Sequence, residues 1–232
     1  MKTAALLKIF IAVALMYLAL LLIDEYMAWY MKPLLLPSMI VAVVASEKFP
    51  TKKLLIIALL FSWFGDVVLM FASKGEMYFI VGLVLFLTAH VLYIFLFQKQ
   101  YKSRHPANKM WLYIGLIGVA GYLFAMLFVL YPTLGGLKIP VTVYAFVISV
   151  MLLMTISGLM SWESPAKYYI FAGAFCFVTS DSLLAFDKFY HPIPMPSFNI
   201  MSTYLAAQFL ITFGILIQNK KQHAVLSDNA AI

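Results

Sequence analysis

The sequence predicts an all-α membrane protein, a polytopic bundle of about eight transmembrane helices. Hydrophobic residues make up 65% of the 232 residues and charged residues only 11%. A soluble domain is about half apolar and about a quarter charged. The mean hydropathy is +0.98, so a core shielded from water cannot absorb all of the apolar surface. The apolar residues also form long runs separated by short polar segments, as lipid-spanning helices require.

These runs define the expected helices and the domain organisation. They lie at 5–23, 33–46, 53–72, 77–97, 110–131, 138–160, 167–186 and 199–218. The second run starts at Lys32-Pro33 and is short, and Pro37 near its start predicts a kinked or partly re-entrant segment. We expect residues 1–219 to form a single transmembrane domain. Residues 220–232 then form a polar cytoplasmic tail, which we expect to be frayed.

Positive charge is distributed unevenly between the two ends of the predicted helices. Four basic residues fall on one side, namely Lys32, Lys74, Lys138 and Lys188. The others fall with the two termini: Lys2, Lys8, Lys48, Lys52, Lys53, Lys99, Lys102, Arg104, Lys109, Lys167, Lys220 and Lys221. The positive-inside rule therefore places both termini in the cytoplasm, and we expect a bacterial inner membrane. These short loops account for the net charge of +7, so we expect lipids and no nucleic acid as partners.

Two carboxylates, Asp66 and Asp181, lie inside apolar runs at a similar depth. A carboxylate within the bilayer is unfavourable by several kcal/mol unless it is paired, protonated or hydrated, so it indicates function by default. Both begin the pattern Asp-x-x-Leu-x-Phe, which suggests two similar four-helix halves related by an axis along the membrane normal. Each aspartate could instead be a structural hydrogen-bonding group, but the matched positions favour a catalytic pair.

Polar side chains inside the other runs are the candidate substrate-binding residues. They are Lys32, Ser62, His90, Tyr93, Tyr144, Ser180, Tyr204 and Gln208. Ser62 is one turn before Asp66, and the Thr179-Ser180 pair precedes Asp181, so hydroxyls can bond each carboxylate. Alternatives remain for three of them. His90 is equally well explained as an interhelical hydrogen-bond partner, Tyr144 as an interfacial tyrosine, and Lys32 as a lysine that snorkels to the headgroups rather than a phosphate ligand.

The residue pattern excludes several classes of site and favours acid catalysis. A single cysteine, Cys176, excludes an internal disulfide framework. The chain has no His-Glu-x-x-His, Gly-x-Ser-x-Gly, Walker or dinucleotide motif, so we predict no metal and no cofactor. Two carboxylates in one apolar cavity are expected to share one proton unequally. One proton donor beside one ionised group suits acid-catalysed cleavage of an ether-like or acetal-like bond.

The order of the motifs resembles that of the YhhN-like family, which includes the animal lysoplasmalogenases. The matching motifs are Lys32-Pro33, Phe61-Ser62-x-x-Gly65-Asp66-x-x-Leu69, His90-x-x-Tyr93, Ser180-Asp181-x-Leu183-Leu184 and Tyr204-x-x-x-Gln208. They extend over nearly the whole chain. The resemblance implies hydrolysis of the vinyl ether bond of a lysophospholipid substrate, a lysoplasmalogen. The products are a fatty aldehyde and glycerophosphoethanolamine or glycerophosphocholine, and no cofactor is needed.

The sequence leaves two questions open. The apolar neighbours Phe64 and Val67 favour Asp66 over Asp181 as the proton donor, without deciding the assignment. Buried Asp and His residues also serve proton relays, and paired repeats suit alternating access. A proton-coupled lipid or small-molecule transporter is therefore one alternative function, and a non-catalytic lipid-binding membrane protein is another. The oligomeric state is not indicated.

Overall fold

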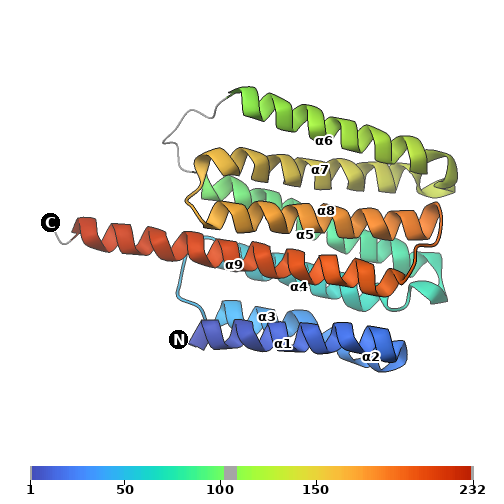
Figure 1. Ribbon diagram of the computed structural model, residues 1–232, viewed down its shortest axis with the longest axis horizontal. Coiled ribbons are helices and arrows are strands. Elements are labelled where there is room, and N and C mark those ends of the chain that lie inside the picture. Colours follow the sequence, from blue (N-terminus) through green and yellow to red (C-terminus); the bar gives the residue numbers. More distant parts are fainter. Residues whose placement is uncertain (1, 102–108, 231–232) are drawn as a thin grey trace.

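The computed structural model describes residues 2–101 and 109–230. It is a bundle of helices that lie side by side, with both ends of the chain at the same end of the bundle (Figure 1). No strand occurs in the described residues. Lys102 and Arg104 of the predicted charge count, and residues 231–232 of the predicted tail, lie outside the described residues, as do the side chains of Lys109 and Lys221.

The elements follow the predicted runs closely. The helices are α1 (Lys2–Ile23), α2 (Glu25–Met31), α3 (Leu35–Val44), α4 (Lys52–Leu69), α5 (Glu76–Gln100), α6 (Lys109–Leu130), α7 (Lys138–Ser161), α8 (Ala166–Phe189) and α9 (Pro196–Ala230). Short 3-10 turns lie at η1 (Lys32–Leu34), η2 (Ala72–Lys74), η3 (Tyr131–Thr133) and η4 (Gly135–Leu137). The prediction of an all-α polytopic bundle is therefore confirmed.

The bundle is built to lie in a membrane. In the part of the chain that the structure describes, seven segments are long and apolar enough to span a bilayer, and α2 and α3 together form one of them. Helix α4 is not among the seven, since its 18 residues include Lys52, Lys53 and Asp66, but it lies parallel to the others within the bundle (Figure 1). The eight expected crossings are thus seven apolar segments and α4.

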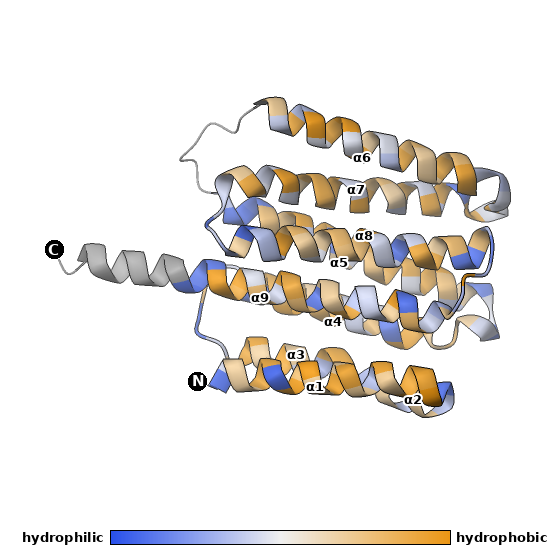
Figure 2. Ribbon diagram, viewed as in Figure 1, coloured by the Kyte–Doolittle hydropathy of each residue, from blue (hydrophilic) through white to orange (hydrophobic). Residues whose placement is uncertain are grey.

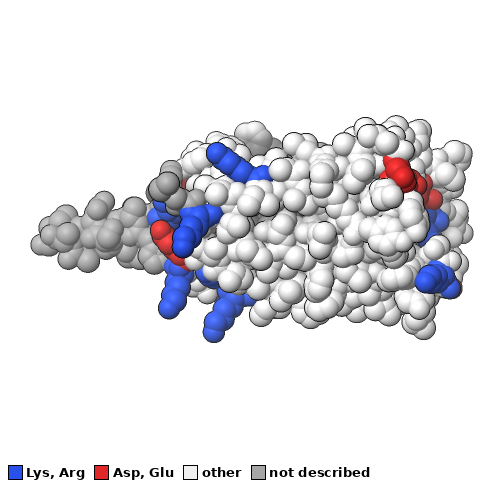
Figure 3. Space-filling view, turned by 90° about the horizontal axis from the view of Figure 1, so that it is seen from below, with Lys and Arg blue, Asp and Glu red and all other residues white. Residues whose placement is uncertain are grey.

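The outer surface of the bundle is apolar along its length. On α6, the side chains of Ile117, Phe124 and Phe128 are each more than two thirds exposed. Apolar residues cover the helices from end to end (Figure 2), and charged side chains gather at the two ends around a broad uncharged band (Figure 3). Such a surface is stable in hydrocarbon but not in water. The protein is an integral membrane protein.

The second span differs from its prediction. Instead of starting at Pro33, it begins at Glu25 and runs to Val44, interrupted by the η1 turn. Lys32 therefore does not open a helix at the membrane surface but lies at a break within the span. Pro33 causes the break because it has no backbone N–H to donate to the preceding helical turn. The predicted kink is thus present as this break, which precedes Pro37.

The break is stabilised by a neighbouring helix. In a regular helix the Pro33 carbonyl would accept a hydrogen bond from the residue at position 37, but Pro37 has no N–H. The indole N–H of Trp63 on α4 donates to the Pro33 carbonyl instead, at 2.8 Å. This bond satisfies a backbone acceptor within the membrane and fixes η1 against α4.

Glycines bring two helix pairs, α4–α5 and α8–α9, into close contact. A Cβ on Gly65 of α4 would lie 2.7 Å from the Phe86 ring of α5. A Cβ on Gly173 of α8 would lie 2.8 Å from the backbone N of Ile211 and 3.0 Å from the Ala207 carbonyl of α9. Small residues at such positions let membrane helices approach closely. The two pairs are the third and fourth spans of each predicted half, so their packing supports the predicted repeat.

The C-terminal segment also differs from its prediction. Helix α9 does not end near Asn219 but continues to Ala230. Most of the segment predicted to be a frayed tail is therefore helical, as a continuation of the last span (Figure 1).

Replacing Gly173 by alanine should destabilise the bundle. The new Cβ meets backbone atoms that cannot move independently, and overpacking of this kind costs about 1–3 kcal/mol. Thermal unfolding in detergent would measure the loss. Gly121→Ala is the matched control, because a Cβ at Gly121 has nothing within 4 Å. Equal melting temperatures for the two variants would contradict the proposed close contact of α8 with α9.

Candidate active site

One cavity of about 400 Å³ lies between α1, α2, α4, α5, α7, α8 and α9, and both Asp66 and Asp181 line it. Its volume is within the range of about 300–1,000 Å³ that is typical of small-molecule sites. At its inner end Asp66 is only 4% exposed, whereas Glu25 and Lys188 at its outer end are exposed. The cavity therefore runs from the interior of the bundle to the end opposite the two termini.

Asp66 on α4 is held by groups from two other segments. The Tyr204 hydroxyl on α9 donates a hydrogen bond to its Oδ2 at 2.7 Å. Lys32 of the η1 turn acts electrostatically on the same carboxylate and lines the same cavity. The break at Pro33 thus places the Lys32 side chain in the same cavity as Asp66. A hydrogen-bond donor and a cation both reduce the cost of a carboxylate in this environment.

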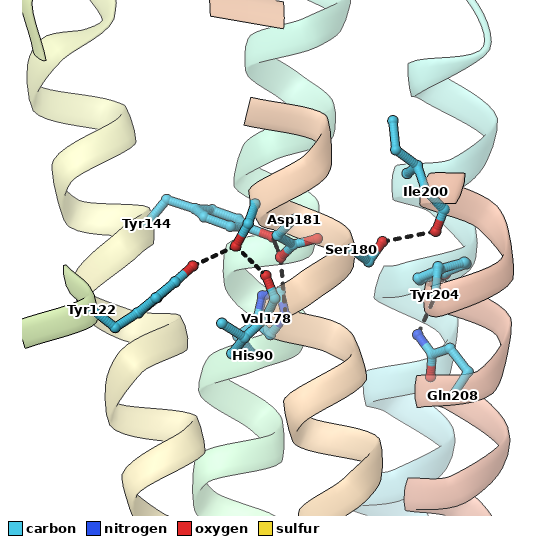
Figure 4. Close-up of polar contacts among 10 residues, drawn as sticks. His90, Tyr122, Tyr144, Val178, Ser180, Asp181, Ile200, Tyr204 and Gln208 are labelled. Atoms are coloured by element: carbon cyan, nitrogen blue, oxygen red, sulfur yellow. Dashed lines mark hydrogen bonds and ion pairs between the residues drawn. The ribbon is translucent and has the colours of Figure 1, made fainter. Parts of the chain in front are cut away.

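A buried chain of hydrogen bonds extends from Asp66 away from the cavity. The Tyr93 hydroxyl donates to Gln208 Oε1 at 2.7 Å. Gln208 Nε2 in turn donates to the Tyr204 hydroxyl at 3.3 Å, and that hydroxyl donates to Asp66 (Figure 4 shows Tyr204 and Gln208). Because Tyr204 accepts from Gln208, its one proton is directed to Asp66. The chain therefore orients the tyrosine towards the carboxylate.

Asp181 on α8 has a different set of partners. The Tyr144 hydroxyl on α7 donates to its Oδ2 at 2.5 Å, and His90 Nε2 on α5 lies 3.6 Å from the same oxygen. Both partners are drawn around Asp181 in Figure 4. The His90 ring is fully buried, and its ring centroid lies 5.4 Å from that of Tyr144 and 4.6 Å from that of Phe177. Both ring nitrogens of His90 lack a hydrogen bond of normal geometry.

The structure brings most of the predicted site residues to one place. Six of them line the cavity, namely Lys32, Asp66, Tyr144, Ser180, Asp181 and Tyr204. The other four lie behind its wall and do not line it: Ser62, His90, Tyr93 and Gln208. Tyr93 and Gln208 act through Tyr204, and His90 lies against Asp181 and Tyr144. The four are thus placed to support side chains of the wall rather than to contact a ligand in the cavity.

None of the hydroxyls predicted to bond the aspartates does so in the structure. Ser180 Oγ donates to the Ile200 carbonyl at 3.0 Å (Figure 4), and Thr179 Oγ1 donates to the Phe175 carbonyl one turn earlier. Ser62 lies beside the Tyr93 hydroxyl. Tyrosines from other helices supply the donors instead, because their longer side chains reach across the helix contacts.

The two carboxylates share the cavity but not a hydrogen bond. Each accepts from its own tyrosine, Asp66 from Tyr204 and Asp181 from Tyr144. The structure therefore shows no direct hydrogen bond between the two carboxyl groups, and the unequal sharing of one proton between them stays a prediction. The sequence neighbours Phe64 and Val67, which favoured Asp66 as the proton donor, do not form the environment of the Asp66 carboxyl group. Phe64 is 49% exposed on the outer surface, and Lys32 and Tyr204 surround the carboxylate instead.

Several cavity residues were not predicted. Tyr17 on α1, Glu25 and Trp29 on α2, and Lys188 on α8 all line the cavity. A signal for three of its residues is present in the sequence, since Glu25, Trp29 and Lys32 are spaced i, i+4 and i+7 and so share one face of a helix. Among the described residues, no group of three or more His, Cys, Asp or Glu side chains could hold a metal ion.

Comparisons with known proteins show to which family the chain belongs. The model of the YhhN family matches residues 27–215, which include Lys32, both aspartates and their tyrosines. Lysoplasmalogenase TMEM86A of Bos taurus is 33% identical over 179 residues, and TMEM86A of Homo sapiens is 30% identical over 179 residues. Each alignment covers 71% of this chain. Lysoplasmalogenase TMEM86B of Homo sapiens is 32% identical over 161 residues, which are 68% of this chain.

The coverage of the relatives is incomplete. The alignments extend over 66% of each TMEM86A chain and 62% of human TMEM86B, slightly less than two thirds of their length. No solved structure matches the chain.

The buried chain from Tyr93 to Tyr204 should be energetically coupled. In a double-mutant cycle with Tyr93→Phe and Gln208→Leu, we expect a coupling energy of about 0.5–1.5 kcal/mol, as for hydrogen bonds between membrane helices. Unfolding in mixed micelles would measure it. The control cycle pairs Tyr93→Phe with Tyr101→Phe, because Tyr101 donates to the unrelated Met154 carbonyl. A coupling energy no larger than that of the control would contradict the hydrogen-bond chain.

Proposed function

Because the chain belongs to the YhhN family, we propose that it is a membrane-embedded hydrolase that cleaves the vinyl ether bond of lysoplasmalogens. The products are a fatty aldehyde and glycerophosphoethanolamine or glycerophosphocholine. The observation that carries this proposal is the lining of one cavity by two carboxylates, Asp66 and Asp181. Each has a hydrogen-bond donor, and the cavity joins them to the end of the bundle where lipid headgroups lie.

The enzyme is preferred to a carrier for two reasons. The relatives that share 30–33% identity with this chain are named lysoplasmalogenases. The cavity also supplies what the reaction needs, since vinyl ether hydrolysis requires a proton donor and a group that stabilises a cation. Acid catalysis by two carboxylates does this without a cofactor.

The reaction begins with a proton transfer to carbon. A carboxylic acid protonates the vinyl carbon β to the ether oxygen, which forms a C–H bond and leaves an oxocarbenium ion. A carboxylate stabilises this cation and then accepts a proton from the water that adds to the α carbon. The hemiacetal then collapses: its hydroxyl proton passes to the carboxylate that gave the first proton, its C–O bond to glycerol breaks, and the other carboxyl group gives its proton to the glycerol oxygen. One water is consumed, and both carboxyl groups return to their starting forms.

The surroundings of the aspartates support distinct roles. The Lys32 cation acts on Asp66, whereas no lysine acts comparably on Asp181 among the described groups. We therefore assign the ionised role to Asp66, whose charge Lys32 compensates, and the role of proton donor to Asp181. This reverses the preference that the sequence neighbours of Asp66 suggested. Tyr204 and Tyr144 orient the two carboxyl groups through their hydrogen bonds.

The cavity wall also fits an amphipathic substrate. Apolar side chains line the inner part of the cavity near the aspartates. They include Leu69, Leu83 and Phe86. They suit the alkenyl chain, while the charged outer end suits the headgroup. If both termini lie in the cytoplasm, as the lysine distribution predicts, the headgroup enters from the non-cytoplasmic side.

Neutralising either aspartate should abolish turnover. In Asp66→Asn and Asp181→Asn the amide can neither donate a catalytic proton nor carry the negative charge, so aldehyde release should fall about 100-fold or more. Mass spectrometry of the aldehyde released from a lysoplasmalogen in detergent measures the rate. Asp24→Asn is the matched control and should keep the wild-type rate, because asparagine still caps α2. Full activity of either active-site variant would refute the two-carboxylate mechanism.

Isotopes of water should report which bond breaks and how. Hydrolysis in H₂¹⁸O should leave the glycerol hydroxyl oxygen unlabelled, because water adds to the vinyl α carbon. The rate should be lower in D₂O, because proton transfer to carbon limits it. The 1-O-alkyl ether with the same headgroup should not react, since it has no double bond to protonate. Incorporation of ¹⁸O into the glycerophospho product would mean attack at the glycerol carbon and would contradict the mechanism.

A further inference from the structure

The α2 segment presents a charged stripe to the outer part of the cavity. Glu25, Trp29 and Lys32 follow one another at i, i+4 and i+7, which places them on one helix face, and all three line the cavity. Lys188, near the C-terminal end of α8, lines the same outer part. Its Nζ lies 5.3 Å from the centroid of the Phe79 ring, which also lines the cavity.

The charges of this outer part are not neutralised by one another. Within the described chain, no ion pair of 4.0 Å or less involves Glu25, Lys32 or Lys188, and the recorded pair of that kind joins His90 to Asp181. Asp187 is different, because its Oδ1 accepts the backbone N–H of Ile193 at 3.0 Å and so closes the turn after α8. Lys32 already acts on Asp66, whereas the exposed Glu25 and Lys188 have no ion-pair partner within the described chain and are available to a ligand with the opposite charges.

We propose that Glu25, Trp29, Lys32 and Lys188 form a subsite for a zwitterionic phospho-amine headgroup, which rests on the hydrolase function proposed above. Lys32 and Lys188 bind the phosphate, while Glu25 and the Trp29 ring bind the ammonium group. The subsite gives the enzyme its preference for ethanolamine or choline headgroups. It disfavours substrates whose headgroup is an unmodified phosphate or is missing.

The order of the groups along the cavity matches the order of groups in the lipid. Lys32 acts on Asp66 at the inner end, and Tyr17 is within electrostatic range of both Asp66 and Glu25. Lys32 lies seven positions after Glu25, which corresponds to about 10 Å along the helix axis. From inside to outside, the cavity thus presents a carboxylate, a lysine and a glutamate. In a lysoplasmalogen the vinyl ether, the phosphate and the amine follow in the same sequence.

Trp29 adds two features that suit an ammonium group. An indole ring is the best aromatic partner for a cation, and Trp29 is 39% exposed beside the cavity. In a regular helix the Trp29 carbonyl would accept a hydrogen bond from the N–H of residue 33, but Pro33 has no N–H. A ring face, a carboxylate one turn away and a carbonyl without its usual helical donor together favour a cationic ligand.

Four substrates separate the contributions of phosphate and amine. They carry the same alkenyl chain on glycerophosphoethanolamine, glycerophosphocholine, glycerol 3-phosphate and glycerol. The values of kcat/KM and KM are measured for wild type, Glu25→Gln and Lys188→Gln in detergent. Glu76→Gln and Lys138→Gln are the matched controls, because both residues lie at the same end of the bundle and neither lines the cavity. Figure 3 shows acidic and basic side chains gathered together at this end.

The wild type should prefer the two zwitterionic substrates by about tenfold or more in kcat/KM over the other two. Glu25→Gln should lower the ratio of the ethanolamine to the glycerol 3-phosphate substrate by about fivefold or more, since it removes attraction for the amine and repulsion of the phosphate. Lys188→Gln should raise KM about fivefold for every phosphate-bearing substrate and leave the glycerol substrate unchanged. The controls should resemble the wild type.

A binding measurement tests the subsite independently of the reaction. Calorimetry measures the binding of 1-O-alkyl analogues, which cannot be cleaved and carry the same four headgroups. If the wild type releases no aldehyde but binds the zwitterionic analogues best, and Glu25→Gln removes that preference, the reaction is wrong and the subsite stands. If the wild type cleaves all four substrates equally, or if the Glu25 and Lys188 variants behave like their controls, the subsite is wrong while the reaction stands.

Discussion

The constraint on which this structure depends is the cost of placing two carboxyl groups inside a lipid-embedded bundle. The bundle meets that cost in the same way at both sites. A tyrosine from another helix donates to each carboxyl group, Tyr204 to Asp66 and Tyr144 to Asp181, and both groups face one cavity that reaches the end of the bundle. The remaining features of the site follow from how the surrounding helices supply those partners.

The partners come from equivalent places in the two predicted halves. The third span of each half carries an aspartate, in α4 and α8, and the second span of the same half supplies Lys32 to Asp66 and Tyr144 to Asp181. The fourth span of the opposite half supplies Tyr204 from α9 to Asp66, and His90 from α5 lies beside Asp181. This crosswise arrangement supports the predicted parallel repeat. It also explains the asymmetry of the site, since a lysine in one half corresponds to a tyrosine in the other.

The sequence was sufficient for the number and order of the spans, because bilayer thickness fixes how long an apolar run must be. It also singled out both aspartates, and it named Tyr144 and Tyr204 as substrate-binding candidates rather than as the hydrogen-bond donors to the aspartates that they are. It was less informative about which way each helix faces, because lipid and the protein interior are both apolar and periodicity is therefore weak. For that reason Ser62 and Ser180 were assigned to carboxylates that they do not bond. Lys32 was placed at a helix start because proline is common at the first position of a helix, whereas here Pro33 interrupts a span and Trp63, which is distant in sequence, stabilises the interruption.

An experimental structure with a 1-O-alkyl lysophosphatidylethanolamine bound tests the central claim most directly, because this analogue has the shape of the substrate but cannot be cleaved. The account predicts that its ether oxygen lies between Asp66 and Asp181, with its phosphate towards Lys32. A ligand bound elsewhere in the bundle, for example in the apolar groove between α6, α7 and α8, with neither aspartate in contact with the ether, would contradict it.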